Sequence, residues 1–99
     1  MNTKIHSIHF DADKKLIEYI MEKTQKMAQF HENIIDSEVF LKLEKSGPAE
    51  NKVIEVKLKT PGKTLFAKEC GKTFEEAADI VMQALSRQVK KQKEKQKRL

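Results

Sequence analysis

The chain has 99 residues, of which 35% are charged and 38% hydrophobic, with only three glycines and two prolines. That length suits a single domain, and the composition is too apolar for a disordered chain of this charge and too polar for a membrane protein. The formal net charge is +5, but residues 87–99 hold seven basic residues and one acid, so this segment carries +6 and residues 1–86 carry −1. The positive excess therefore lies at the C-terminal end of the sequence.

Several classes of protein are excluded early. The single cysteine, Cys70, cannot form an internal disulfide, so the chain is not a disulfide-stapled secreted scaffold. The opening segment MNTKIHSIHF lacks the apolar run of a signal peptide. The longest apolar stretches, such as Val39-Phe40-Leu41, are far shorter than the ~20 residues that a membrane-spanning helix needs. We therefore expect a cytoplasmic protein that has no membrane partner.

The N-terminal third predicts a strand followed by a helix. Residues 4–10 alternate, with Ile8 and Phe10 on the same face as His6, which indicates a short strand. Asp13 is a good helix N-cap, and the apolar residues after it recur at helical spacing, so we predict a helix over residues 13–31. Its buried stripe consists of Leu16, Ile17, Ile20, Thr24, Met27 and His31, with Met21 and Ala28 at its edge.

The middle of the chain predicts three more strands. Residues 37–45 alternate, which points Val39, Leu41 and Leu43 inward, and Ser46-Gly47-Pro48 marks a turn after them. Residues 52–59 alternate again, with Ile54, Val56 and Leu58 inward. The Pro-Gly pair in Thr60-Pro61-Gly62-Lys63 then predicts a hairpin into a strand over residues 64–70.

A second helix ends the chain. Thr73-Phe74-Glu75-Glu76 matches a capping box, in which the threonine caps the helix and Glu76 follows three residues later. The buried stripe of this helix consists of Phe74, Ala78, Val81, Leu85 and Val89.

The element order is therefore β-α-β-β-β-α. A strand–helix–strand start favours a right-handed crossover between parallel strands, and the later strands form an antiparallel meander. We expect an α+β two-layer sandwich with two helices on one face of a four-stranded sheet. Residues 1–99 form a single domain, in which residues 87–99 are a basic helical extension or tail.

The sequence offers no catalytic or metal site. His6 and His9 lie at an odd spacing, so a strand sends them to opposite faces and they cannot chelate one ion together. Cys70 has no nearby base, and we expect it to be an inert, part-buried thiol. Glu75 and Glu76 suit the first turn of a helix for electrostatic reasons alone. We therefore expect no enzyme, no cofactor, no metal and no small-molecule substrate.

The first helix carries basic and aromatic residues beside its apolar stripe. One shoulder of the helical wheel holds Lys15, Tyr19, Lys23, Lys26 and Phe30. Lysines that alternate with aromatic rings suit phosphate contact with a stacking ring nearby. The same pattern also fits a core edge along which lysine stems extend, and both readings stay open.

The second helix carries the stronger basic signal. Its apolar stripe stops at Val89, and the next positions on that face are Gln92 and Lys93, so this segment should project into solvent rather than pack on the sheet. A basic end on a near-neutral body favours an anionic partner, with RNA as the leading candidate. A membrane surface is disfavoured, because only Val89 and Leu99 could anchor this segment.

Four segments resemble a known family. LSRQVKKQKEKQKRL at 85–99 is similar to a Leu-x-Arg-Gln-hydrophobic-x-Lys-x-Lys-x-Lys ending, and LKLEK at 41–45 resembles that family's second strand. Lys23 and Lys26, with Met27, match a Lys-x-x-Lys-Leu segment of its first helix. GKTFEEAAD at 71–79 resembles the start of its second helix and keeps the positions of Ala77 and Asp79. The family is that of the bacterial ribosome hibernation promoting factors, also called ribosome-associated inhibitor or sigma-54 modulation proteins, in its short form.

The chain departs from this family at three points. Glu75 stands where the family has a tyrosine, so any stacking or hydrogen bonding by that ring is lost or moved. The loop after Lys45 is a few residues longer. The additional C-terminal dimerisation domain of the family's long form is absent from the 99 residues.

The resemblance implies a non-enzymatic inhibitor of translation under starvation or in stationary phase. Such proteins occupy the small ribosomal subunit in the channel where mRNA and the A- and P-site tRNAs bind, and the folded body excludes tRNA. We expect a monomer when free. The residues expected to contact rRNA phosphates are Lys23, Lys26, Arg87, Lys90, Lys91, Lys93, Lys95 and Lys97.

Two other functions remain open. One is a generic double-stranded-RNA-binding module, because two helices on a sheet can span an RNA minor groove. The other is a protein-interaction domain that acts on an acidic partner such as a sigma factor.

Overall fold

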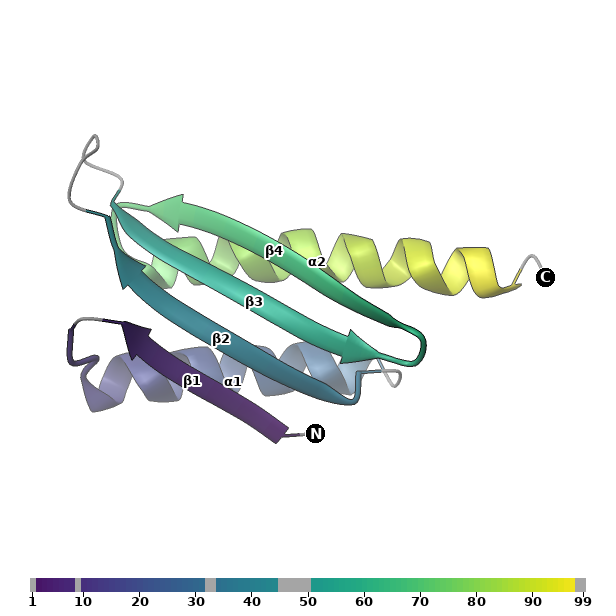
Figure 1. Cartoon of the computed structure of the whole chain (residues 1–99), viewed down its shortest axis with the longest axis horizontal. Coiled ribbons are helices and arrows are strands. Elements are labelled where there is room, and N and C mark those ends of the chain that lie inside the picture. Colours follow the sequence, from purple (N-terminus) through teal and green to yellow (C-terminus); the bar gives the residue numbers. More distant parts are fainter. Residues whose placement is uncertain (1, 9, 32–33, 45–50, 98–99) are drawn as a thin grey trace.

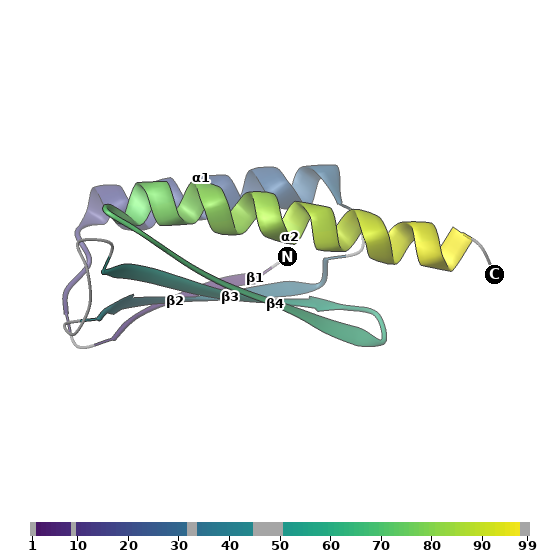
Figure 2. The same ribbon diagram turned by 90° about the horizontal axis from the view of Figure 1, so that it is seen from above.

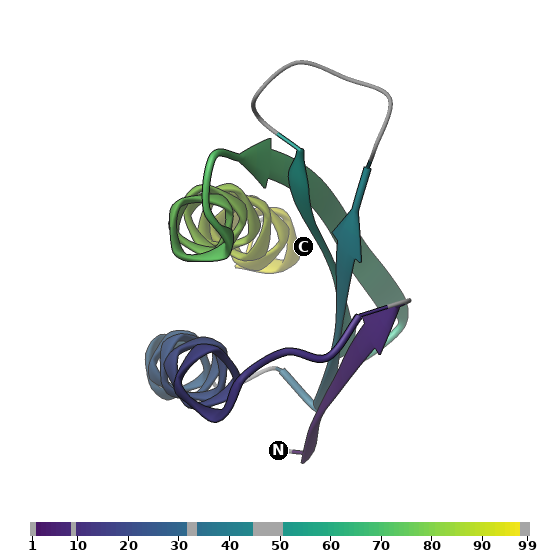
Figure 3. The same ribbon diagram turned by 90° about the vertical axis from the view of Figure 1, so that its left-hand side faces the viewer.

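The chain folds into a sheet layer and a helix layer (Figures 1 and 2). The computed structural model describes residues 2–8, 10–31, 34–44 and 51–97. The elements are β1 (Asn2–Ile8), α1 (Lys14–Phe30), β2 (Asp36–Leu43), β3 (Lys52–Thr60), β4 (Lys63–Gly71) and α2 (Phe74–Lys97). This order confirms the predicted β-α-β-β-β-α sandwich, and both helices lie on the same side of the sheet in Figure 3.

The strands lie in the order β1-β2-β3-β4. β1 pairs in parallel with β2, with His6 level with Phe40, whereas β2, β3 and β4 pair antiparallel. Helix α1 provides the crossover between the two parallel strands, as the sequence predicts. The sheet therefore has one face under the helices and one face open.

The first strand differs from its prediction in extent. It begins at Asn2 and ends at Ile8, so Phe10 does not lie on the strand beside His6. The Phe10 ring instead stacks on Phe74 at the start of α2, with the ring centroids 5.2 Å apart. This contact places an apolar ring at the edge of the core, where it is partly buried. His9 lies outside the described residues.

Helix α1 begins at the predicted N-cap. The Asp13 carboxylate accepts a hydrogen bond from the Leu16 backbone N–H at 2.7 Å. Ile20 and Thr24 on the predicted stripe are fully buried, and the Thr24 hydroxyl donates to the Ile20 carbonyl at 2.8 Å. After the helix, the buried His31 ring lies with Nε2 3.0 Å from the Ser86 Oγ of α2, so it ties the two helices together.

The core lies between the helices and the inner face of the sheet. The predicted stripe of α2 is buried throughout, as are most of the inward residues of the strands. They are Val39, Leu41, Ile54, Val56, Leu58, Leu65, Ala67, Phe74, Ala78, Val81, Leu85 and Val89. Leu43 is the exception to its prediction, at 38% exposed. Because it is the last residue of β2, it has sheet neighbours on one side only.

Two glycines serve the connections. Gly62 has a φ of +77° in the Pro61-Gly62 turn, and Thr60 pairs with Lys63 across it, so the predicted hairpin is confirmed. At Gly71 a Cβ atom would lie 3.1 Å from the backbone nitrogen of Ala77, so a glycine lets α2 begin directly against the end of β4. The turn predicted at residues 46–48 lies outside the described residues.

Helix α2 begins at the predicted threonine cap. The Thr73 Oγ1 accepts from the Glu76 backbone N–H at 3.0 Å, and the Thr73 carbonyl accepts from the Ala77 N–H at 3.1 Å. These bonds satisfy backbone donors that the first turn of a helix otherwise leaves unpaired.

Candidate nucleic-acid interface

The two helices meet along a polar seam. The Tyr19 hydroxyl on α1 donates a 2.9 Å hydrogen bond to the Asp79 carboxylate on α2. The Lys23 ammonium lies 3.3 Å from the same carboxylate oxygen and 5.4 Å from the centre of the Tyr19 ring. Two side chains of the shoulder that the sequence singles out, Tyr19 and Lys23, therefore contact α2 and share one acid.

The shared acid changes the acidity of both groups. The hydrogen bond to Asp79 raises the pKa of Tyr19, because a phenolate would lose this bond and face a carboxylate. The same carboxylate raises the pKa of Lys23, because it favours the charged ammonium. Lys23 therefore keeps its positive charge, but Asp79 offsets that charge locally.

Removing this acid has a directly measurable effect. Tyr19 is the only tyrosine and the chain has no tryptophan, so its ionisation can be followed by absorbance near 295 nm without interference from another residue. Wild-type protein should titrate above the ordinary tyrosine pKa of ~10, and Asp79→Ala should move the titration back toward it. Glu75→Gln is the matched control, because Glu75 contributes the smallest of the named effects and should shift the titration little.

The same coupling sets the sign of an alkaline effect on stability. The pKa of Tyr19 is higher in the folded state than in the unfolded state. Its contribution to the free energy of unfolding is therefore complete below the unfolded pKa and is lost as the pH rises through the folded pKa.

In the absorbance titration, an Asp79→Ala variant whose Tyr19 titrates like that of the wild type would contradict the seam as described.

A groove follows the seam. It is lined from α1 by Lys23, Lys26 and Met27, and from α2 by Asp79, Met82, Gln83 and Ser86. Lys26 is exposed there, and it forms no ion pair with any residue in the described ranges. Of the two predicted lysines of α1, Lys26 is thus the one available to a phosphate, whereas Lys23 is shared with Asp79.

The basic end of α2 continues from this groove. Arg87, Lys90 and Lys91 are exposed. Lys90 lies one turn beyond the groove residue Ser86, so the groove and the basic end form one surface along the helix. Lys93, Lys95 and Lys97 lie in the same continuous helix, and their side chains are outside the described part.

The docking of α2 extends further than the sequence predicts. The predicted packing ends at Val89, which is buried. The Gln88 amide also donates to the Phe66 carbonyl at 3.2 Å, and the Gln92 amide donates to the Thr60 hydroxyl at 3.0 Å. Hydrogen bonds from glutamine amides thus replace apolar contacts at the edge of the sheet, and the bond from Gln92 lies beyond the predicted end of packing at Val89. Beyond them the helix passes the β3–β4 turn, which Figure 2 shows from above.

The suspected metal and catalytic residues have other surroundings. His6 Nε2 lies 2.8 Å from a carboxylate oxygen of Glu38, and its ring stacks on Phe40 on the open face of the sheet. Within the described ranges, no three His, Cys, Asp or Glu side chains gather into a metal site. The part-buried position expected for Cys70 is wrong, because the residue is exposed near the end of β4.

Comparison with known proteins assigns the family. The model of a family described as Sigma 54 modulation protein / S30EA ribosomal protein matches residues 3–97. The chain belongs to this family. The Sigma 54 modulation / S30EA assignment confirms the resemblance drawn from the sequence.

One curated relative and two solved structures are similar to this chain. The chain is 29% identical over 99 residues to the ribosome hibernation promoting factor of Pseudomonas putida, a match that covers 100% of this chain and 93% of the relative. A ribosomal subunit interface protein from Coxiella burnetii has the same fold, with a TM-score of 0.84 and 20% identity over 94% of this chain and 98% of that one. The N-terminal domain of Protein Y from Thermus thermophilus gives a TM-score of 0.76 and 20% identity, and the match covers 92% and 98% of the two chains.

Proposed function

We propose that this protein is a ribosome hibernation factor. It binds the small ribosomal subunit in the mRNA and tRNA channel, over the A and P sites, and inhibits translation in the cytoplasm of starved or stationary-phase cells. The observation that carries the proposal is the set of exposed cations at Lys26 beside the groove and at Arg87, Lys90 and Lys91 further along α2, on a body that is otherwise near neutral. The Pseudomonas putida relative is named a ribosome hibernation promoting factor, which agrees with this reading.

Binding rests on phosphate contacts. Lys26 of α1 and Arg87, Lys90 and Lys91 of α2 are exposed cations, and they would neutralise rRNA phosphates and release counterions. Lys93, Lys95 and Lys97 follow in the same helix and would add further phosphate contacts. Lys23 would contribute less to phosphate binding, because Asp79 already balances part of its charge.

Inhibition requires no reaction. The folded body measures 45 by 25 by 18 Å, and its packed helix–sheet core would occupy volume that a tRNA needs. The protein acts as a monomer with no cofactor. No helix in the described part of the chain is long and apolar enough to cross a membrane.

Sedimentation with purified ribosomal particles tests the proposal. At low salt the protein should travel with isolated small subunits and with whole ribosomes, and should remain at the top of the gradient with isolated large subunits. Ribosomes preloaded with tRNA in the P site should take up less protein, because the two compete for one volume. A protein that stays at the top with small subunits, or that binds tRNA-filled ribosomes equally well, contradicts the proposal.

The two alternatives give different results in the same assay. A generic double-stranded-RNA module would be released by an excess of plain RNA duplex, whereas a ribosome-specific factor should stay bound. The family description also names modulation of sigma 54. An acidic protein partner of that kind would survive nuclease treatment in a pull-down, but a complex held by rRNA would not.

A further inference from the structure

The open face of the sheet carries a band of rings and cations that crosses all four strands. His6 of β1 stacks on Phe40 of β2, with ring centroids 5.0 Å apart and planes inclined by 20°. The Lys57 ammonium of β3 lies 5.6 Å from the centre of the Phe40 ring. Lys57 is level with Phe66 of β4 in the strand register, and Phe66 is 48% exposed. The helix layer lies on the other side of the sheet (Figure 3).

The Phe66 ring is an apolar side chain that lies half exposed to water on the open face. Its side chain points away from the core, because its neighbours on β4, Leu65 and Ala67, are the buried ones. The Gln88 amide of α2 holds the Phe66 carbonyl at 3.2 Å, so the backbone that presents the ring is tied to the helix layer. The open face thus presents the exposed ring of Phe66 from a backbone that is hydrogen-bonded to α2.

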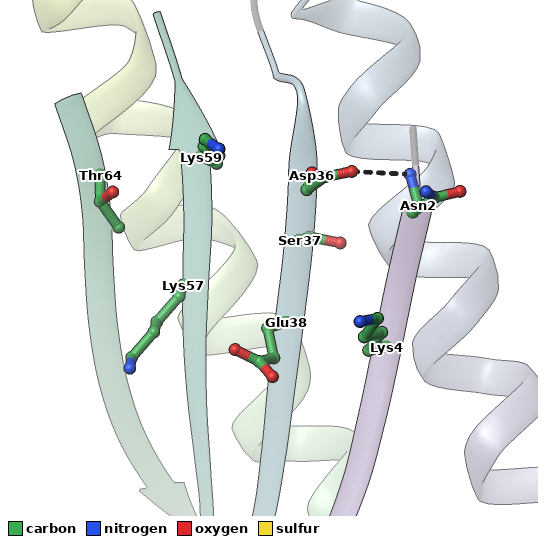
Figure 4. Close-up of a pocket in the computed structure, with 8 residues that line it drawn as sticks. All are labelled: Asn2, Lys4, Asp36, Ser37, Glu38, Lys57, Lys59 and Thr64. Atoms are coloured by element: carbon green, nitrogen blue, oxygen red, sulfur yellow. Dashed lines mark hydrogen bonds between the residues drawn. The ribbon is translucent and has the colours of Figure 1, made fainter. Parts of the chain in front are cut away.

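The lysines of this face fall into two groups. Lys42 and Lys68 form ion pairs with Glu55, with Nζ–Oε1 distances of 2.9 and 3.8 Å. In contrast, Lys4, Lys57 and Lys59 line a shallow hollow beside the band and form no ion pair with a residue that the structure describes (Figure 4).

The acids of the hollow have partners of their own. Asp36 accepts from the Asn2 backbone N–H at 3.4 Å, and Glu38 lies 2.8 Å from His6. In Figure 4 the Lys57 side chain extends toward β4, the strand that carries Phe66. The hollow therefore brings available cations next to the exposed ring.

We propose that this open face is a second RNA contact, which takes unpaired nucleotides. A base would stack on Phe66, and Lys57 and Lys59 would lie near its phosphates. Stacking needs a free base face, which a duplex hides between its own base pairs, so the ring selects single strands. A ring beside cations also suits a nucleotide better than it suits an apolar protein surface. The proposal goes beyond the proposed function, because it concerns the face opposite the helices.

The absence of tryptophan from the chain makes a direct test possible. The variant Phe66→Trp places the only tryptophan of the chain on this face, where excitation near 295 nm selects it over Tyr19, and an unstructured octauridylate RNA should quench it as a base stacks. Leu43→Trp is the matched control, because Leu43 is also an exposed apolar residue at a sheet position, away from the band. An RNA duplex of equal length should leave the Phe66→Trp signal unchanged.

Affinity measurements supply the second arm. Phe66→Ala should weaken octauridylate binding by about 5- to 10-fold, as expected for the loss of one base–ring stack. Lys57→Gln with Lys59→Gln should also weaken it, whereas Lys14→Gln with Lys72→Gln, two exposed lysines away from the band, should not. Unchanged affinity in Phe66→Ala, absence of quenching in Phe66→Trp, or equal quenching by the duplex would each overturn the proposal.

The result is independent of ribosome binding. Sedimentation of wild-type protein with small subunits tests the proposed function, whereas the octauridylate assays contain no ribosome. Quenching without ribosome binding would leave the sheet contact standing alone, and ribosome binding without quenching would remove only the sheet contact.

Discussion

Changing Arg87, Lys90 and Lys91 to glutamine should strongly weaken ribosome binding and make the remaining binding less sensitive to salt. All three side chains are exposed on the helix end that continues from the groove. Each phosphate contact to single-stranded RNA adds ~0.7 to the slope of log affinity against log salt, so three lost contacts should lower the slope by ~2.1. Between 50 and 200 mM salt, the wild-type affinity should then fall by about 20-fold more than that of the variant.

The control for this variant keeps the net charge equal. Lys14, Lys63 and Lys72 are exposed but lie away from the groove. Their replacement by glutamine should therefore change the ribosome affinity and the salt slope much less than the α2 variant does. Sedimentation across a salt series measures both variants, and circular dichroism checks that α2 stays helical. Equal slopes for the two triple variants would mean that binding follows total charge and that α2 has no special part in it.

Leu85→Ala should have the largest effect on stability. Leu85 is fully buried on the α2 stripe, where that helix packs on the inner face of the sheet. Loss of a buried leucine side chain and the cavity left behind typically cost about 3 kcal/mol, a substantial part of the ~5–15 kcal/mol by which a domain of this size is stable. The melting temperature should fall by about 15 °C.

Thermal unfolding followed by circular dichroism measures this loss. Leu43→Ala provides the matched comparison, because it makes the same chemical change at the exposed end of β2 and should cost less than about 1 kcal/mol. Similar losses in both variants would contradict the core as described. At temperatures where Leu85→Ala remains folded, it should still bind ribosomes, since it leaves the basic surface in place.

The sequence predicts the fold well because each long element has one apolar face. The alternation in β2 and β3 and the helical stripe of α2 each indicate which face is buried, independently of what covers it. The Asp13 and Thr73 caps and the Pro61-Gly62 turn are equally local, because their partners lie within four residues. Local chemistry therefore determines the element order and most boundaries.

The sequence predictions fail where a contact with a residue far along the chain determines the local structure. Phe10 leaves the predicted strand because Phe74, 64 residues later, offers its ring a place at the core. Gln88 and Gln92 dock on the sheet through amides that the apolar pattern does not register. Periodicity indicates a buried face but does not indicate which polar groups will meet.

The candidate site could be predicted in part for the same reason. The basic end of α2 is visible in the charge distribution, and its residues Arg87, Lys90 and Lys91 are exposed. The engagement of Lys23 by Asp79 could not be foreseen, because the two residues meet only when the helices lie side by side. The contact of these cations with rRNA stays a prediction.

The basic end of α2 lies at one tip of a molecule 45 Å long, whose remaining residues are close to neutral. Such a molecule has a large electric dipole moment along its long axis. The field of a polyanion exerts a torque on that dipole, so the protein should rotate and approach with the C-terminal tip first, before any phosphate is touched. The charge of α2 thus governs the orientation and rate of encounter as well as the lifetime of the complex.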